Sequence, residues 1–235
     1  MEKEIQKIST GFTRRLALGL AAAATLAFSA PAVARDAPQQ IVDDAAATLS
    51  SMLADGKMDW LRTNMPKARG VLIAPRIVKA GFIIGGSGGN AVLVTRGADG
   101  TWAGPAFYNL STGSIGFQAG FSEAESVTLV MSQKAVDKMM TGSVKMGGDL
   151  SIATGPVGGG AKSNVKADLI TFMRAKGIYG GVNMTGTGVG TDASRNATFW
   201  ATPDITPTQI LVTRTVKPNP GAAKLLNLVT YEGKR

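Results

Sequence analysis

Thirty glycines, many of them alternating with apolar residues, are the feature of this 235-residue chain that most constrains its fold. This pattern is typical of β structure with many turns. Apolar residues alternate with glycine, serine and one glutamine over residues 114–122, which predicts a strand with one face open to close approach. Further strands, joined by glycine and proline turns, are predicted at residues 71–74, 127–131, 147–153, 169–176, 177–190 and 197–201.

Helical patterns lie towards both ends of the chain. Apolar residues recur at helical spacing over residues 39–55, and Ser132 is a suitable N-cap for a second helix that ends at Gly142. A third helix is predicted to begin at Asn219-Pro220, a cap followed by a first-turn proline. We therefore predict an α+β fold: a single domain with a curved or barrel-like antiparallel sheet and flanking helices at both ends.

Residues 1–34 have the pattern of an export leader. The pair Arg14-Arg15 precedes an uncharged run, and residues 32–34 read Ala-Val-Ala, a signal-peptidase pattern. We predict a signal peptide of the twin-arginine (Tat) type, with the Sec route and an uncleaved anchor as alternatives. The mature chain would be residues 35–235, periplasmic or secreted. Cleavage removes four basic and two acidic residues and lowers the net charge from +9 to +7.

The sequence offers little catalytic chemistry. It has no histidine and no cysteine, which excludes Ser-His and Cys-His nucleophile pairs and most zinc sites. Glu123 and Glu125 share one face of a strand; we interpret them as an exposed edge, with a carboxylate-pair hydrolase as the alternative. The glycine-rich segments 85–90 and 155–160 are predicted turns. They are not interpreted as phosphate loops, because neither has a phosphate-loop ending. We predict a protein that is not an enzyme and has no cofactor or metal.

A basic stretch is the main functional signal. Between Asp59 and Asp99 the chain has no acidic residue and six basic ones, Arg62, Lys67, Arg69, Arg76, Lys79 and Arg96. A one-signed patch on a β scaffold indicates an anionic partner, although a solvated basic surface is the alternative. Trp102, Tyr108 and Trp200 are predicted core or rim residues. Too few aromatic residues accompany the basic ones to stack bases, so no nucleic-acid partner is expected.

Six short segments resemble, in their order and spacing, the SYLF lipid-binding domain family. They are residues 65–71, 78–82, 85–89, 99–105, 147–156 and 174–182, which read MPKARGV, VKAGF, GGSGG, DGTWAGP, GGDLSIATGP and RAKGIYGGV. The resemblance runs from about residue 45 to the C-terminus. It implies binding of phosphoinositides and other anionic lipids, actin binding in some eukaryotic members, and export in bacterial members.

The first predicted helix differs from the family pattern. Lipid binding in eukaryotic members is attributed partly to a basic amphipathic N-terminal helix, whereas residues 39–55 contain Asp43, Asp44 and Asp55 and no lysine or arginine. The basic stretch could compensate. We expect peripheral, non-enzymatic binding of anionic phospholipids at the envelope, such as phosphatidylglycerol or cardiolipin. The alternative is a structural or protein-interaction domain with incidental positive charge. The expected lipid-binding residues are Lys67, Arg69, Arg76, Lys79 and Arg96.

Overall fold

The computed structural model describes residues 37–81, 84–115, 120–158, 165–175, 178–179 and 184–232; the predicted leader lies outside these ranges. The helices are α2 (Pro38–Ala54), η1 (Gly56–Met58), α3 (Asp59–Asn64), η2 (Met65–Lys67), α4 (Gln133–Met139), α5 (Ala193–Trp200), α6 (Pro207–Leu211), η3 (Pro220–Ala222) and α7 (Ala223–Glu232). The strands are β1 (Gly70–Gly81), β2 (Ile84–Arg96), β3 (Trp102–Ile115), β4 (Gly120–Val130), β5 (Ser143–Lys145), β6 (Ile152–Thr154), β7 (Leu169–Ala175), β8 (Ile178–Tyr179) and β9 (Gly188–Thr191).

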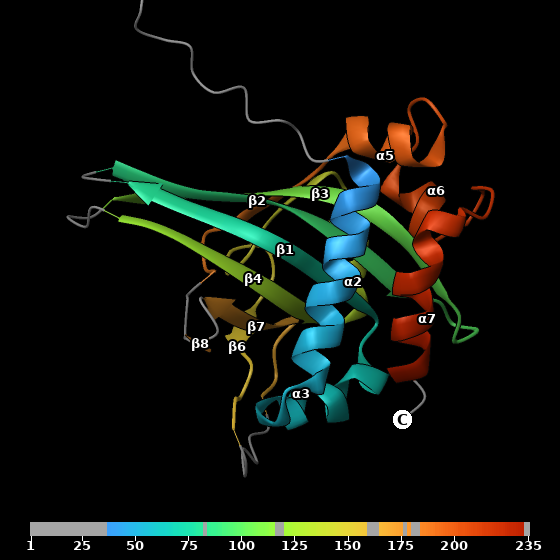
Figure 1. Ribbon diagram of the computed structural model, residues 1–235. Coiled ribbons are helices and arrows are strands. Elements are labelled where there is room, and N and C mark those ends of the chain that lie inside the picture. Colours follow the sequence, from blue (N-terminus) through green and yellow to red (C-terminus); the bar gives the residue numbers. More distant parts are fainter. Residues whose placement is uncertain are drawn as a thin grey trace, which may run out of the picture. The chain divides into compact units, whose positions relative to one another are not determined.

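The described strands form one curled, half-barrel sheet. Its order is β5-β9-β3-β2-β1-β4-β7-β6, with β8 paired to β7. All neighbouring strands are antiparallel except β6 and β7. The long strands β1 to β4 extend past the helices at one end of the sheet (Figure 1). The predicted α+β class, with one curved and mainly antiparallel sheet, is confirmed. Among the described residues, no helix combines the length and the apolar character that a membrane crossing requires.

One face of the sheet, which we call the outer face, is covered by α2 and α7 (Figure 1). Leu49 and Met52 of α2 are fully buried and pack in the same apolar cluster as Ile73 and Leu129 of the central strands. The α7 helix adds Leu225 to this cluster. The helical spacing seen in the sequence therefore produces the stripe that buries the outer face.

The opposite face, which we call the inner face, holds a second buried cluster. Val189 of β9 and Leu169 of β7 both belong to it, although these strands lie towards opposite edges of the sheet, so the sheet curls around this cluster. Helices α4 and α6 also contribute to this cluster. The predicted caps are confirmed: the Ser132 hydroxyl accepts a hydrogen bond from the Ala135 amide, 3.1 Å, and the Asn219 side chain accepts one from the Gly221 amide, 2.8 Å.

A β-bulge at Pro75 decides which face the second half of β1 presents. The pairing of β1 with β2 shifts between Ile73 and Arg76, and the pairing with β4 shifts between Ala74 and Ile77. Pro75 is the extra residue in both ladders, in keeping with the confinement of strand prolines to edges and bulges. Because a shift of one residue exchanges the two faces, Ile77 belongs to the inner cluster although Ile73 belongs to the outer one.

The predicted turn at residues 85–90 is wrong, because these residues form part of β2. They pair with β1 on one side and with β3 on the other. A Cβ at Gly86 would lie 3.2 Å from the Thr112 carbonyl oxygen, and one at Gly89 would overlap the Arg76 carbonyl oxygen. The glycines thus permit close backbone approach inside the sheet rather than a change of chain direction.

The predicted strand at residues 197–201 is also wrong, since residues 193–200 form α5. The Asp192 carboxylate accepts a hydrogen bond from the Arg195 amide at 3.0 Å and caps the helix. Asn196 is fully buried, and its side chain accepts from the Phe107 amide at 2.8 Å. These two polar contacts favour a helix over the apolar, strand-like composition.

Three other predicted strands have different bounds. The pattern at residues 114–122 is not one strand, because β3 ends at Ile115 and β4 begins at Gly120; residues 116–119 lie outside the described ranges. Of residues 147–153, only the last two belong to a strand, β6. Residues 177–190 contribute β8 and most of β9, and residues 180–183 are likewise outside the description.

Candidate functional site

Two of the six residues in the basic stretch hold the local fold together. Arg62 donates to the carbonyl oxygens of Leu53 and Asp55, at 2.6 and 2.7 Å, and pairs with Asp59. These contacts satisfy carbonyl groups at the C-terminus of α2, where a cation is favourable. Arg96, the last residue of β2, is the second.

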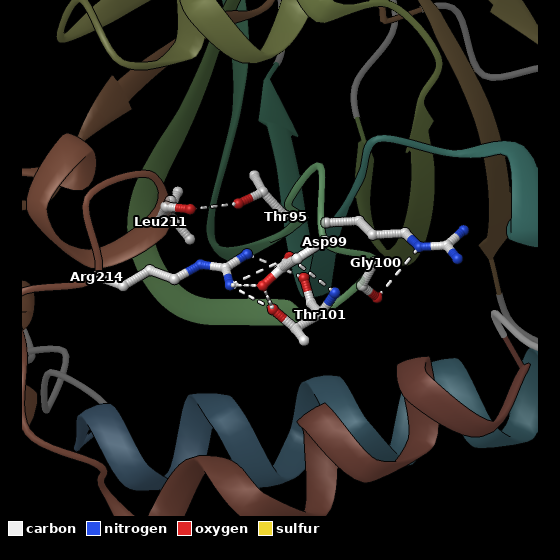
Figure 2. A network of polar contacts seen from close by, with 7 residues as sticks. Thr95, Asp99, Gly100, Thr101, Leu211 and Arg214 are labelled. Atoms are coloured by element: carbon white, nitrogen blue, oxygen red, sulfur yellow. Dashed lines mark hydrogen bonds and ion pairs between the residues drawn. The ribbon is translucent and has the colours of Figure 1, made fainter.

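Arg96 belongs to a polar region around the turn between β2 and β3. Its guanidinium donates to the carbonyl oxygen of Pro66 at 2.7 Å and to that of Gly100 at 3.3 Å. In the same turn, Arg214 from the segment after α6 pairs with the Asp99 carboxylate at 3.2 Å (Figure 2). Hydrogen bonds from Thr101, together with Arg214, hold the pKa of Asp99 below its ordinary value. Arg96 thus joins this turn to Pro66 of η2, and Arg214 joins the same turn to the segment after α6, so both arginines have a structural role.

Arg76 is paired on the outer face. Its guanidinium contacts the Glu123 carboxylate at 2.5 Å, and the two side chains are 61% and 46% exposed. Glu125, two residues further along β4, pairs with Arg174 and accepts from the Thr48 hydroxyl of α2 at 2.9 Å. The two glutamates therefore share a face as predicted, but β4 is an interior strand rather than an edge, and each carboxylate has a basic partner.

The remaining three basic residues, Lys67, Arg69 and Lys79, are exposed and make no ion pair with a described residue. Lys67 and Arg69 lie beside the start of β1, where Lys67 donates to the Asn64 side chain at 3.1 Å. Lys79 lies near the other end of the strand, about 30 Å away at the usual rise per residue. The structure therefore does not bring the predicted basic residues together into one patch.

Lys79 lies instead at a cavity on the inner face. The cavity has a volume of about 300 Å³ and is lined by β1, β2, β3, β4 and β7, with residues 184–187 opposite. Among its described lining residues, Lys79 is the one charged side chain. Because the Pro75 bulge exchanges the faces of β1, Lys79 follows Ile77 onto this side of the sheet. Proline inside a strand pattern is the sequence signal that could have predicted this placement.

The strand register arranges the cavity lining in two adjacent rows across the sheet. The polar row consists of Thr112, Ser87, Lys79 and Ser122, each directly opposite the next. The apolar row consists of Leu110, Ile77, Ala124 and Ala175, and Gly89, which does not line the cavity, pairs with both Leu110 and Ile77. The hydroxyls of this polar row were not identified from the sequence, because only strand pairing reveals that they are neighbours of Lys79.

The segment opposite the sheet is held in place by hydrogen bonds. The hydroxyls of Thr112 and Thr187 lie 2.7 Å apart, and the Thr187 amide donates to the carbonyl oxygen of Met184 at 3.0 Å. The Gly186 amide donates to the carbonyl oxygen of Met146 at 2.7 Å. Thus the cavity has two walls joined by direct contacts.

Other shifted groups are explained by structural contacts. A hydrogen bond from the Ser132 hydroxyl, with others from Ser151, lowers the pKa of Asp168 to about 2. Burial would raise the pKa of Asp192, but the contacts from Arg195 lower it. Tyr108 is buried in the inner cluster, as a predicted core residue, and burial raises the pKa of its hydroxyl. Within the described ranges, no three acidic, histidine or cysteine side chains are grouped as metal ligands would be.

The fold and the cavity define an α+β domain whose half-barrel sheet encloses an amphipathic pocket. Residues 111–231 match the Ysc84 family, described as "Las17-binding protein actin regulator". The chain belongs to this family, which confirms the resemblance found in the sequence. The matched residues begin within β3, so every basic residue of the stretch between Asp59 and Asp99 precedes them.

Curated relatives share limited identity with the chain. Protein YSC84 of Saccharomyces cerevisiae is 27% identical over 172 residues, which are 70% of this chain and 36% of the relative. LAS seventeen-binding protein 3 of the same yeast is 26% identical over 172 residues, 70% of this chain and 37% of the relative. The human SH3 domain-containing YSC84-like protein 1 is 30% identical over 125 residues, 51% of this chain and 36% of the relative. The chain thus spans about a third of the length of these relatives.

Proposed function

We propose that this domain binds anionic phospholipid at a membrane surface and catalyses no reaction. The observation that carries the proposal is Lys79, which has no acidic partner among the described residues and lies in a row of hydroxyls beside an open, partly apolar cavity. Ammonium and hydroxyl groups donate hydrogen bonds to phosphate oxygens, and apolar walls favour the lipid part of the same molecule. The absence of histidine and cysteine from the chain supports a binding role.

Three exposed basic residues supply the charge in this proposal. Lys67 and Arg69 act at one end of β1 and Lys79 at the other, and each contributes about 1 kcal/mol at best near an anionic surface. Arg76 can contribute by exchanging Glu123 for a phosphate, because an exposed ion pair is weak. Arg96 is assigned no lipid contact, since its guanidinium is engaged by two carbonyl oxygens. Binding of this kind is weak and sensitive to salt.

The test is co-sedimentation of the purified protein with vesicles of phosphatidylglycerol, cardiolipin or phosphatidylcholine. We expect binding to the two anionic lipids, little binding to phosphatidylcholine, and loss of binding towards 0.5 M salt, where the Debye length is about 4 Å. The variants are Lys79→Gln and the pair Lys67→Gln with Arg69→Gln. The pair Lys217→Gln with Lys224→Gln is the matched control, because it removes two exposed charges elsewhere.

Each site variant should weaken vesicle binding several-fold, in line with about 1 kcal/mol per charge, while the control pair changes it less. A wild-type protein that ignores anionic vesicles at low salt would refute the proposal. The proposal would also be refuted if the site pair and the control pair weakened binding equally and Lys79→Gln had no effect. Net charge alone would then explain the binding.

The location in this proposal is the periplasm or the exterior of the cell. It is supported by the leader pattern of residues 1–34, with its paired arginines and its Ala-Val-Ala end. Mass spectrometry of the exported protein should give Arg35 as the first residue. Replacing Arg14 and Arg15 by lysine should stop export if the twin-arginine route is used, and export of an intact chain would exclude cleavage.

A second candidate function is a protein-interaction domain. The observation that favours it is the family description, which names Las17 binding and actin regulation. Under this candidate the positive charge is incidental. It is supported if the wild type ignores anionic vesicles, and if crosslinking in the native cells gives one defined protein adduct that the Lys79→Gln variant retains.

A further inference from the structure

The polar row of the cavity has the chemistry of an oxyanion site. Lys79 lies directly opposite Ser87 on β2 and Ser122 on β4, so one ammonium group has a hydroxyl-bearing residue on each side. All three residues line the cavity, and no acidic residue does so among those described. An ammonium group and two hydroxyls offer several donors to one carboxylate or phosphate head.

The apolar row continues directly from this polar row into the core. Ile77 precedes Lys79 by two residues and faces the same side, and Leu110 occupies the matching position on β3. Ile77 and Leu110, together with Met173 and Met184, belong to the inner buried cluster and also line the cavity. Methionine side chains adapt to irregular apolar ligands, because they have several rotatable bonds and a polarisable sulfur atom.

The size of the cavity limits its occupant. A volume of about 300 Å³ is at the lower end of the range for small-molecule pockets. This space suits one hydrocarbon chain, or part of one, better than the two chains of a phospholipid. The hydroxyl contact between Thr112 and Thr187, at 2.7 Å, joins the sheet to the opposite wall and limits widening on that side.

From these observations we infer that the cavity binds a single-chain anionic amphiphile, with its carboxylate or phosphate head at Lys79 and its chain against Ile77 and Leu110. The inference rests on the proposed lipid function and deepens it, since it assigns a class of lipid to a defined site. Surface binding to a vesicle needs only exposed charge, whereas this site also needs the apolar cavity. The two ideas can therefore fail separately.

The first experiment measures binding of sodium dodecanoate and dodecyl phosphate to the purified protein by calorimetry, each below its micelle concentration. Both should bind. Dodecyltrimethylammonium, which has the same chain and a cationic head, and inorganic phosphate, which has no chain, should bind at least tenfold more weakly. Lys79→Gln should weaken dodecanoate binding about tenfold to a hundredfold, because a charge-assisted hydrogen bond is lost. Lys224→Gln is the matched control, since Lys224 is an exposed lysine of α7 and does not line the cavity.

The second experiment locates the chain without relying on a variant. In protein labelled with ¹³C at the methionine methyl groups, dodecanoate should shift the signals of Met173 and Met184, which line the cavity. The signal of Met52 should not move, because Met52 is fully buried in the outer cluster. A variant that fills the cavity, Ala124→Leu, should lose dodecanoate binding.

The outcomes separate the inference from the proposed function. Vesicle binding without dodecanoate binding would overturn the inference and leave the surface proposal standing. Dodecanoate binding that shifts Met173 and Met184, in a protein that ignores vesicles, would support the inference and refute the surface proposal. Equal binding of the anionic and cationic amphiphiles, or equal effects of Lys79→Gln and Lys224→Gln, would overturn the assignment of the head group to Lys79.

Discussion

Replacing Gly89 by alanine should destabilise the domain, because Gly89 lies beside the bulge in β1. It pairs with Ile77, close to the register shift. A Cβ at position 89 would overlap the Arg76 carbonyl oxygen and lie 3.2 Å from the Ile77 Cα atom. Both neighbours are backbone atoms within a paired strand, so neither can rotate away as a flexible side chain would. The strand must shift or the bulge must distort.

The size of the effect follows from two opposing contributions. Overpacking of this kind costs about 1–3 kcal/mol of unfolding free energy. Alanine has fewer accessible backbone states than glycine in the unfolded chain, and this raises the unfolding free energy by about 0.4–1 kcal/mol. The net loss is then about 1–2 kcal/mol, which lowers the Tm of a domain of this size by about 2–8 °C.

Thermal and urea unfolding of the Gly89→Ala and Gly113→Ala variants test this reasoning. Gly113 is an exposed glycine of the neighbouring strand β3, and a Cβ there would have no neighbouring atom within 4 Å. Its replacement should leave stability unchanged or raise it by up to about 1 kcal/mol. If the two variants have the same Tm and the same urea midpoint, the Arg76 carbonyl oxygen does not crowd position 89. The bulge geometry inferred from the register would then be incorrect.

Four further substitutions test the polar contacts. Asn196→Ala should lower the unfolding free energy by about 1–3 kcal/mol in urea titrations, because a buried strand amide loses its acceptor; an unchanged midpoint would contradict this. Glu125→Gln should cost about 1–2 kcal/mol and Glu123→Gln under about 1 kcal/mol, because the pair of Glu125 with Arg174 is less exposed; equal losses would oppose the burial argument. The pKa of Asp168 is lowered to about 2, so the native state binds fewer protons than the unfolded state below pH 4. Stability should therefore fall as the pH falls from about 4 to 2, and Asp168→Asn should flatten that part of the profile, as measured by unfolding at each pH.

The fold class and the helix starts could be predicted because their signals are local. The apolar spacing of α2 and the caps at Ser132 and Asn219 act over a few residues, and the structure contains all three features. The strand at residues 169–175 was recognisable for the same reason, since its buried positions form one continuous run. Elements specified by their own few residues are those that the sequence alone reveals.

The errors occurred where distant contacts decide the structure. Residues 85–90 contain turn-forming residues, yet partners on both sides keep them in a strand. Residues 197–200 have apolar character, yet the cap at Asp192 and the bond from Phe107 to Asn196 place them in a helix. A local sequence pattern does not reveal which distant residues will be its partners. In both places these contacts override the local secondary-structure propensity.

The residues of the basic stretch lie apart in the structure for a related reason. The basic residues are neighbours in sequence, but their contacts come from elsewhere: Arg62 caps a preceding helix, Arg76 meets Glu123, and Arg96 meets Pro66. A charge run along an extended strand also spreads over about 3.3 Å per residue and alternates between two faces. Closeness in sequence is thus a poor guide to a surface patch when the scaffold is a sheet.

A single proline explains how the fold and the candidate site are linked. Regular alternation from Ile73, an outer-face residue, would have placed Ile77 and Lys79 on the outer face, beside the helices. The extra residue Pro75 reverses the faces, so Ile77 extends the inner cluster and Lys79 lies between two hydroxyl-bearing strands. The same reversal leaves Arg76 on the outer face with Glu123. The bulge therefore assigns one basic residue to an ion pair and another to the cavity.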